Sequence, residues 1–560
     1  MKKNWKVIAA VFAILCVVVF GGIYATRNVG KTEREVDTES ATAKLEKMYN
    51  KVKPDEAKPR KSAVEYNGSE TTAVELPDIE TCAVNAKATT SWYVEIWSSP
   101  EKAGVGDDGW LCEMANNFNR QQNQVDGKTV SVQIRNVNSG QAVDYVSSGA
   151  AVPDAISASS MFWTNMLNAK GVDTEVISER LVGNVVGMVF KNDKYKEFVD
   201  TYGEVDAKSV VDAVAAGAYT IGYTNPNAST GGMNWLITTL QRFDDKNPLS
   251  DAAVEGFKSF QKNVPFVALT TMQMRDAAGN GAFDGFVMEY QSYQKDANLR
   301  TNYTFTPYGY RHDNPLVAIG TLEQWKLDTL KMFAEFCESP ESQVTASAYG
   351  FNAMDNYQYE LPMVSGDVLV SAQKIYKQNK DNGQKVCAVF VTDVSGSMQG
   401  EAITQLKDGL INSMRYINAE HYIGLVSFAS GVTIEVPIAQ FDMNQQALFK
   451  GGVEGLDAIG STYMYDGLIV AMRMISKKME EEPNLKPMIF LLSDGDNMWG
   501  HSYNDVAPLI STLGYPIYTI GYNENNDVLD KLSSINEAEN INANTDDIVY
   551  QLKVLFEANM

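Results

Sequence analysis

The chain has little of several residue types on which common enzyme and nucleic-acid sites depend. It contains 3 histidines in 560 residues, which argues against histidine-built zinc sites and serine–histidine triads. Its 47 basic residues face 70 acidic ones, a net charge of −23 that argues against sequence-independent binding of nucleic acid. The sequence also has no GxxxxGK[ST] phosphate loop and no recognisable nucleophile–base pair. We therefore do not expect an enzyme.

Cysteine is equally scarce, and its spacing carries no metal or redox signature. The five cysteines are Cys16, Cys82, Cys112, Cys337 and Cys387, and none lies in a CxxC pair. Zinc ribbons and thioredoxin-like motifs are therefore without support. The wide spacing does not indicate a disulfide framework, and it leaves the pairing of Cys82, Cys112 and Cys337 open.

The length and the apolar content are sufficient for several folded domains. The chain is 44% hydrophobic, 10% aromatic and 21% charged, which excludes global disorder. Because a domain usually has about 100–200 residues, we expect two to four domains.

The N-terminus carries one long apolar run. Three lysines precede the run, which extends from Val7 to Ala25 and is about as long as the ~20 residues that cross a bilayer as a helix. We predict a signal anchor over residues 1–26, with the N-terminus in the cytoplasm and the rest of a single-pass membrane protein outside the cell membrane. A signal peptide cleaved after Ala25 remains an alternative.

The segment after this run is charged and poor in aromatic residues. Residues 27–87 therefore predict an extended stalk, with a short helix around Ala41–Val52.

The C-terminal third alternates apolar strands with amphipathic helices. Strands are predicted at 386–393, 421–428, 487–494 and 515–522, with helical patterns between them. This alternation predicts an α/β fold, a mostly parallel sheet with helices on both faces. In such sheets ligands bind beyond the carboxyl ends of the strands.

Oxygen-bearing side chains gather at those strand ends. Asp393, Ser395 and Ser397 follow the first strand, Thr462 precedes a helix, and Asp494 follows a later strand. Carboxylate and hydroxyl oxygens are ligands for Mg²⁺, and also for Mn²⁺ or Ca²⁺. With few carboxylates the ion stays electron-poor, so we expect it to seek an acidic residue of a protein partner.

These residues lie in three motifs that resemble von Willebrand factor type A domains. The motifs are DVSGSM at 393–398, GSTYMYDGL at 460–468 and LLSDGDN at 491–497, in the order of the family. The resemblance covers residues 385–560 and implies a Rossmann-like αβα sandwich. It also implies a metal-ion-dependent adhesion site in which Ser395, Ser397 and Thr462 touch Mg²⁺ and the two aspartates bind directly or through water.

The middle of the chain, residues 88–345, has a different pattern. Several predicted strands end in serine-rich loops, and NPNASTGG at 225–232 opens a helix. Hydroxyls and free backbone N–H groups at a helix start suit an anion or carboxylate. The alternative, that Ser229 or Thr230 is simply an N-cap, remains open.

This pattern resembles the type 2 extracellular solute-binding proteins of bacterial ABC transporters. The resemblance implies two α/β lobes joined by a hinge, with a small molecule or anion in the cleft. It departs from an oxyanion binder because no cleft arginine is evident. By position it makes cleft candidates of Ser98, Ser99, Ser139, Gly140, Ser159, Ser229, Thr230 and Gly231. Residues 346–384 connect the two modules, either as a packed bridge or as a flexible linker.

Together these features predict a bacterial, membrane-anchored, extracytoplasmic binding protein. The metal-dependent domain would engage a protein partner, and the solute-binding-like module would act as a sensor or second interaction surface. The alternative is a receptor that delivers a solute to an ABC-type transporter. Neither function involves nucleic acid.

Overall fold

The structure is a computed structural model, and it describes most of the chain. The described residues are 33–64, 76, 78–261, 264, 266–268, 274, 284–380, 385–495, 497–522, 527–536, 540–542 and 552, without the side chains of 33–37, 266–268 and 540–542. The predicted membrane span lies outside this set. Among the described helices, none combines the length and the apolar character that crossing a membrane requires.

The terminal domain is built on one sheet of seven strands in the order β1-β17-β16-β15-β18-β19-β20. Its strands pair in parallel, except that β17 runs antiparallel to β16. The strands from the C-terminal third are β15 (Val386–Asp393), β16 (Tyr422–Phe428), β17 (Val432–Gln440), β18 (Lys486–Ser493), β19 (Ile517–Gly521) and β20 (Asn540–Asn542). The chain order reverses beside β15, which makes its carboxyl end a topological switch point.

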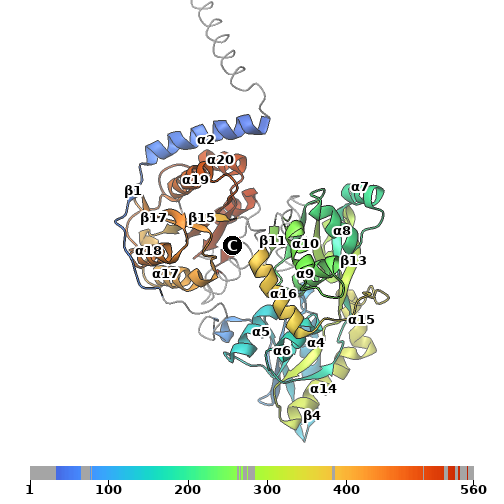
Figure 1. Ribbon diagram of the computed structural model, residues 1–560. Helices are drawn as coiled ribbons and strands as arrows, with labels where there is room; N and C mark the ends of the chain where they lie inside the picture. Colours follow the sequence, from blue (N-terminus) through green and yellow to red (C-terminus); the bar gives the residue numbers. More distant parts are fainter. Residues whose placement is uncertain are drawn as a thin grey trace, which may run out of the picture.

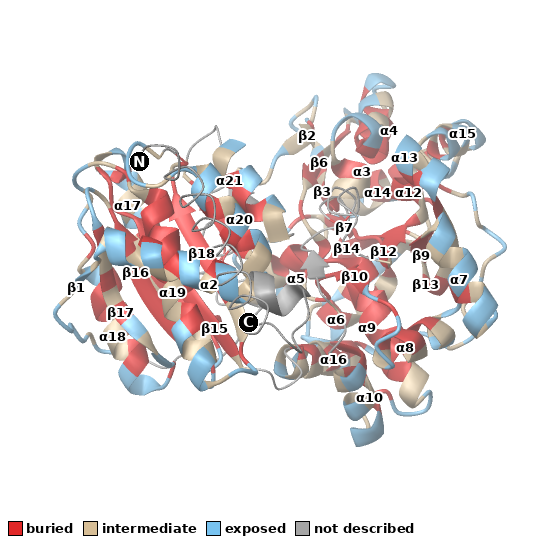
Figure 2. Cartoon of the chain, turned by 90° about the horizontal axis from the view of Figure 1, so that it is seen from above, coloured by how far each residue is buried: buried red, intermediate tan, exposed pale blue. Residues whose placement is uncertain are grey.

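Helices cover both faces of this sheet, as Figure 2 shows. Alternate residues of β15 are buried in two different cores. Val386, Ala388 and Phe390 belong to one core, and Cys387, Val389 and Val391 belong to the other. This double burial explains why β15 is a continuous apolar run. The helices are α17 (Glu401–Ser413), α18 (Met443–Glu454), α19 (Met464–Glu481), α20 (Tyr503–Leu513) and α21 (Asp527–Ser533).

An N-terminal arm, residues 33–64, packs along the terminal domain and not away from it (Figure 1). Its helix α2 (Glu33–Val52) lies on α19 and α20. Ala41, Leu45 and Met48 of α2 are buried in the same core as β15. The expected extended stalk at 27–87 is therefore wrong for this part, because an apolar stripe on α2 gains burial there.

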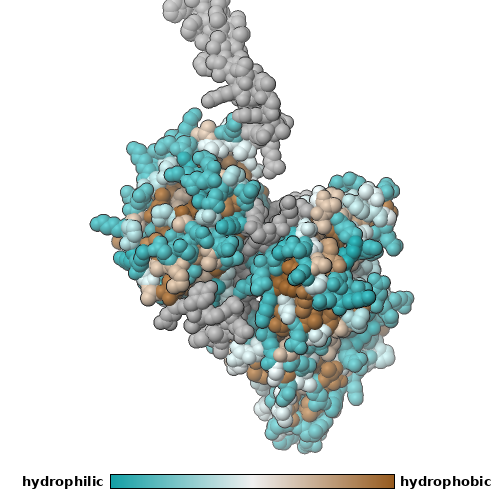
Figure 3. Space-filling model, viewed as in Figure 1, coloured by the Kyte–Doolittle hydropathy of each residue, from teal (hydrophilic) through white to brown (hydrophobic). Residues whose placement is uncertain are grey.

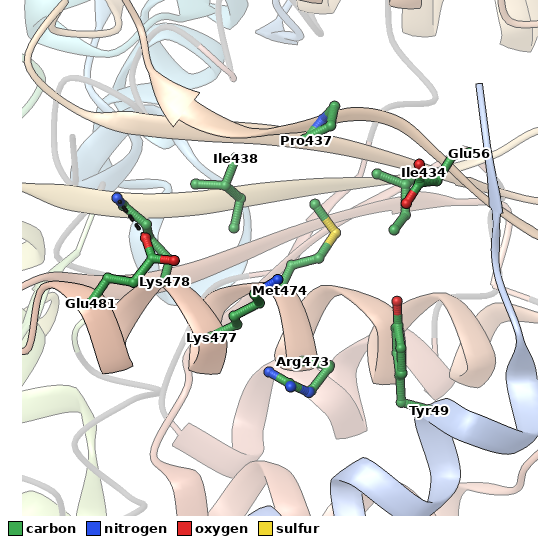
Figure 4. Close-up of a pocket in the computed structure, with 10 residues that line it drawn as sticks. All are labelled: Tyr49, Glu56, Ile434, Pro437, Ile438, Arg473, Met474, Lys477, Lys478 and Glu481. Carbon is green, nitrogen blue, oxygen red and sulfur yellow. Dashed lines mark hydrogen bonds and ion pairs between the residues drawn. The ribbon is translucent and has the colours of Figure 1, made fainter. Parts of the chain in front are cut away.

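The arm also extends the sheet. Strand β1 (Asp55–Glu56) pairs in parallel with the edge strand β17, opposite Thr433 and Ile434. Beyond it, the Ser62 N–H donates to the Ala447 carbonyl at 3.0 Å. A pocket of about 330 Å³ lies between the arm and α19, with Tyr49 and Glu56 on its arm side (Figure 4). The terminal domain is thus assembled from both ends of the chain, with the middle module inserted between them.

The inserted module has two lobes, each with its own sheet. The first lobe has the order β2-β6-β3-β7-β14-β8 and the second β11-β10-β12-β9-β13. The chain crosses between the lobes after β8 and again after β13. The first-lobe strands are β2 (Val84–Ala86), β3 (Tyr93–Ser98), β6 (Ser131–Asn136), β7 (Ala155–Ser157), β8 (Thr174–Ser178) and β14 (Leu316–Ile319). The second-lobe strands are β9 (Asn184–Lys191), β10 (Ile221–Thr224), β11 (Phe266–Ala268), β12 (Gly285–Glu289) and β13 (Tyr303–His312).

The helices of the two lobes meet in a shared core. A single apolar cluster includes Trp97 and Trp163 from the first lobe and Trp235 and Val287 from the second. The principal helices are α3 (Pro100–Ala103), α4 (Trp110–Arg120), α5 (Ser139–Ser148), α6 (Met161–Ala169), α8 (Ala207–Ala215), α9 (Thr230–Phe243), α10 (Asp251–Gln261) and α14 (Gln324–Glu338). The first lobe also has the short strands β4 (Gln124–Val125) and β5 (Lys128–Thr129).

The connector between the modules is largely packed. Helix α15 (Pro340–Ala348) ends within its first residues, and α16 (Gly366–Asn379) follows and lies against α6, α9 and α10. Leu369, Ala372 and Tyr376 of α16 are fully buried. The packed-bridge alternative is therefore the one observed for these residues.

The visible surface of the molecule is mainly hydrophilic (Figure 3). The four cysteines in the described part of the chain are free thiols.

Candidate functional site

The predicted metal ligands lie on neighbouring loops at the carboxyl edge of the terminal sheet. Asp393 ends β15, and Asp494 directly follows β18, the strand beside it. The loop before α19, which carries Thr462, is tied to the loop after β15: Gly396 N–H donates to the Gly460 carbonyl at 3.0 Å. We call Asp393, Ser395, Ser397, Thr462 and Asp494 the candidate cation site.

Asp393 is completely buried and organises the loop that follows it. Its Oδ1 accepts the Ser395 N–H at 2.8 Å, and its Oδ2 accepts the Ser493 hydroxyl at 2.6 Å. Burial raises the pKa of Asp393 to about 6, the bonds from Ser395 and Ser493 oppose the rise, and Asp494 adds to it. A carboxylate whose charged form is disfavoured by burial gains from a cation beside it.

The other four residues of the candidate cation site differ in the burial and hydrogen bonding of their oxygens. The Ser395 and Ser397 hydroxyls lie 2.9 Å apart, and Ser397 is exposed. Thr462 is buried, and its carbonyl accepts two backbone N–H groups of the next loop. Asp494 Oδ1 is buried and has no hydrogen-bond partner among the residues that the structure describes. A buried anionic oxygen without a donor indicates a missing positive ligand.

The residues present fit a hard divalent cation. Two carboxylates and three hydroxyls match the oxygen preference of Mg²⁺ and leave positions for water or a partner. Within the described part of the chain, no cluster of three or more His, Cys, Asp or Glu side chains is placed to hold a metal. A cation here would therefore depend on the hydroxyls.

Several supporting residues escaped the sequence interpretation. Gly460 has φ +97°, and a Cβ there would lie 2.6 Å from Ser430 Oγ, which accepts the Ser461 N–H at 2.9 Å. Asp466 accepts from the backbone of His501 at 2.9 Å and lies 2.6 Å from its Nδ1. These contacts fix the loops beside Thr462. Only the glycine before Ser461 gave a sequence signal, because left-handed backbone favours glycine.

The second candidate site, the interlobe cleft, is closed by direct contacts. The Gly140 N–H donates to the Ala228 carbonyl at 3.3 Å. Trp163 Nε1 of the first lobe donates to Thr230 Oγ1 of the second at 2.8 Å. A Cβ at Gly140 would lie 1.9 Å from the Asn227 carbonyl oxygen, so only glycine permits this approach.

All eight predicted cleft residues are buried, but only some face the remaining space. Ser99, Ser139, Ser229 and Thr230 line a pocket of about 10 Å³. This volume is at the limit for one water, so a larger solute requires the lobes to move apart. The others lie outside the lining: Ser98 donates to the Ser157 carbonyl, Ser159 pairs with Ser99, Gly140 contacts the opposite lobe, and Gly231 packs beside Glu289.

Polar groups in and behind this pocket were also missed. Ser139 Oγ is buried, and no described residue is its hydrogen-bond partner. Lys102 is fully buried, and its Nζ donates to the Ser157 and Ala158 carbonyls at 2.5 and 3.3 Å and to Ser157 Oγ at 3.1 Å. Burial lowers the pKa of Lys102 to about 7, against the opposing charge of Glu101. The cleft thus has a buried basic residue behind its serines. No cleft arginine was evident from the sequence, and this lysine was not among the predicted cleft residues.

Lys102→Met is expected to lower the free energy of unfolding of the two-lobe module by about 2 kcal/mol, because it removes the amine that donates to the buried Ala158 carbonyl and one of the two side-chain donors of the Ser157 carbonyl. Denaturant unfolding would measure this change, with exposed Lys87→Met as the matched control. Equal stability of the two variants would show that the amine does not hold the Ser157 loop.

Comparison with known proteins identifies both modules. Residues 388–557 match the von Willebrand factor type A domain, and residues 106–352 match the bacterial extracellular solute-binding protein family. Inter-alpha-trypsin inhibitor heavy chain H3 of Bos taurus is 28% identical over 148 residues, covering 24% of this chain and 16% of that protein. Heavy chain H4 of Bos taurus is 32% identical over 123 residues, covering 20% of this chain and 13% of that protein. The chain therefore spans less than a fifth of the length of these relatives.

One solved structure shares a weak overall likeness. Iron-bound HitA from Pseudomonas aeruginosa aligns with a TM-score of 0.37 at 12% identity, covering 52% of this chain and 99% of that one. The two family matches confirm the predicted modules and their order. The chain thus carries in one polypeptide a segment that matches the bacterial extracellular solute-binding protein family, followed by a segment that matches the von Willebrand factor type A domain.

Proposed function

We propose that this is a membrane-anchored, extracytoplasmic binding protein whose terminal domain holds Mg²⁺ and uses it to engage a protein partner. The observation that carries the proposal is the pair Asp393 and Asp494 at the switch point of the sheet. One carboxylate is fully buried with a raised pKa, and the other has a buried oxygen without a donor. Both features are costly without a cation and favourable with one.

Some residues of the candidate cation site orient its loops, and others would bind the metal. Asp393 orients the Ser395 loop through its two accepted hydrogen bonds. The hydroxyls of Ser395, Ser397 and Thr462 would supply neutral oxygens, and Asp494 a charged one. When bound, Mg²⁺ would supply an electron-poor centre that accepts a carboxylate oxygen from the partner.

A thermal-unfolding titration of the full chain with Mg²⁺ tests the metal site. Saturation at about 100 times the Kd is expected to stabilise the protein by about 2.7 kcal/mol. Asp494→Asn is expected to remove most of this gain, while Asp457→Asn, an exposed carboxylate on a neighbouring loop, retains it. An equal Mg²⁺ response of wild type and Asp494→Asn would refute the site. Mn²⁺ and Ca²⁺ titrations rank the ion preference.

The solute-binding-like module would serve as a sensor or a second interaction surface. A closed pocket lined with hydroxyls, with Ser139 Oγ unpartnered, supports a small polar ligand or anion. The competing function, a receptor for an ABC-type transporter, predicts capture of a permease with or without metal. Cross-linking of the full chain in Mg²⁺ and then in EDTA separates the two, because only the adhesive function loses its partner in EDTA.

A further inference from the structure

Three large apolar side chains are exposed around the candidate cation site. Ile459 is 71% exposed, Met498 68% and Trp499 60%. Among the described residues of the terminal domain, the only other large apolar side chain with comparable exposure is Met443, on α18. Exposed apolar residues gathered at one place indicate an interaction site more strongly than scattered ones.

Each of these residues is hydrogen-bonded through its backbone N–H either to a residue of the candidate cation site or to the residue between two of them. Ile459 N–H donates to the carbonyl of Val394, between Asp393 and Ser395, at 2.8 Å. Met498 and Trp499 both donate their N–H to the Thr462 carbonyl at 3.1 Å. The backbone segments that carry the apolar side chains are therefore tied to the loops of the cation site.

The loop that carries Trp499 is also fixed from its other end. His501 donates its N–H to Asp466 Oδ1, and a Cβ at Gly500 would lie 2.6 Å from the same carboxylate. Gly500 has φ +84°, a conformation in which other residues are strained. An exposed tryptophan on a fixed loop loses little entropy when a partner covers it, which is the property of a binding hot spot.

We propose that Ile459, Met498 and Trp499 form an apolar rim that covers the flanks of the partner's metal-binding acid. The partner is a protein loop in which one aspartate or glutamate is framed by large apolar side chains. Charge favours this occupant over an acidic stretch: the chain carries a net charge of −23, and Asp457, an exposed acid, directly precedes Ala458 and Ile459. One carboxylate satisfies the cation, while further acids would meet repulsion.

This inference rests on the proposed metal-dependent function. A peptide array can show whether the apolar rim or the metal-dependent function is wrong. The full chain is applied in Mg²⁺ or EDTA to cyclic peptides with a central Asp or Asn. The central residue is flanked by Leu and Phe, by Ser, or by Glu. We expect binding only in Mg²⁺, only with Asp, and at least about tenfold tighter with Leu and Phe flanks than with Ser or Glu flanks.

Substitutions in the rim complete the test. Trp499→Ala is expected to weaken the apolar-flanked Asp peptide by about thirtyfold and Met498→Ser by about tenfold. Met443→Ser, which removes an equally exposed methionine on α18, leaves binding unchanged. Mg²⁺ stabilisation of all three variants shows that the cation site is intact.

The outcomes separate the two ideas. Equal Mg²⁺-dependent binding of Ser-flanked and apolar-flanked peptides overturns the rim and leaves the metal function standing. If the apolar-flanked peptides bind equally well in Mg²⁺ and in EDTA, and equally well with a central Asn as with a central Asp, the metal-dependent function is overturned. Binding of none of the peptides, or Met443→Ser weakening binding as much as Met498→Ser, also overturns the rim.

Discussion

Replacing Leu45 with alanine is expected to lower the free energy of unfolding of the terminal domain by about 3 kcal/mol, the usual cost of a cavity at a buried leucine. Leu45 is completely buried, yet it lies in the N-terminal arm, far from the domain in sequence. It shares the core that holds β15 and α19. The loss should therefore appear in the transition of the terminal domain and not in that of the two-lobe module. Circular dichroism in denaturant, with domain-specific hydrogen exchange, measures it.

The matched control is Lys47→Ala on the exposed face of α2. Because alanine has a high helix propensity and this lysine buries no surface, little change is expected. If Leu45→Ala were as stable as Lys47→Ala, the arm would not be part of the terminal core. The same reasoning predicts that a fragment beginning at residue 385 is much less stable than the full chain, since it lacks α2 and β1. Metal titrations consequently require a protein that includes residues 33–64.

Replacing Gly140 with alanine is expected to open the two-lobe module. The added methyl group would lie 1.9 Å from the Asn227 carbonyl oxygen and 2.9 Å from Ala228 Cα, both backbone atoms of the opposite lobe. Backbone cannot rotate away as a side chain does, so the lobes must separate and the Gly140–Ala228 hydrogen bond must break. Overpacking of this kind costs about 1–3 kcal/mol. Small-angle scattering should report a larger radius of gyration, and hydrogen exchange should rise around residues 225–229.

Gly431→Ala provides the same chemical change where no atom lies within 4 Å of the added carbon. Its scattering curve is expected to match that of the wild type. If Gly140→Ala also kept the wild-type curve and exchange rates, the closed cleft would be flexible enough to absorb the methyl group. The glycine would then have no role in closure.

The positions of the candidate cation-site residues could be predicted from local sequence patterns. The apolar run ending at Asp393 and the similar run ending before Asp494 predicted adjacent strand ends, and parallel pairing places such ends together. The apolar rim was not predicted, because exposure of Met498 and Trp499 depends on what the rest of the fold leaves uncovered. A sequence pattern reports which side chains are apolar and not which of them remain in water.

The arm was misjudged for a related reason. Ala41, Leu45 and Met48 follow helical spacing, but charged neighbours lowered the mean hydropathy of the segment. Strand β1 has only the acidic residues Asp55 and Glu56, both exposed, so no alternation marked it. Its pairing depends on backbone hydrogen bonds to an edge strand distant in sequence. Closure of the cleft likewise depended on one glycine approaching a backbone from the other lobe.

The placement of the arm has a consequence for how the chain is made. Lys44 of α2 donates to the Asp505 carbonyl of α20, a contact between residues 461 positions apart. During synthesis α2 is made before the two-lobe module, whereas α19 and α20, which cover its apolar stripe, are made after it. Contacts of such long separation form slowly, and the waiting surface invites association with other chains. The two-lobe module can therefore fold well before the terminal domain closes around α2, and premature termination would release chains with a folded two-lobe module and an uncovered helix.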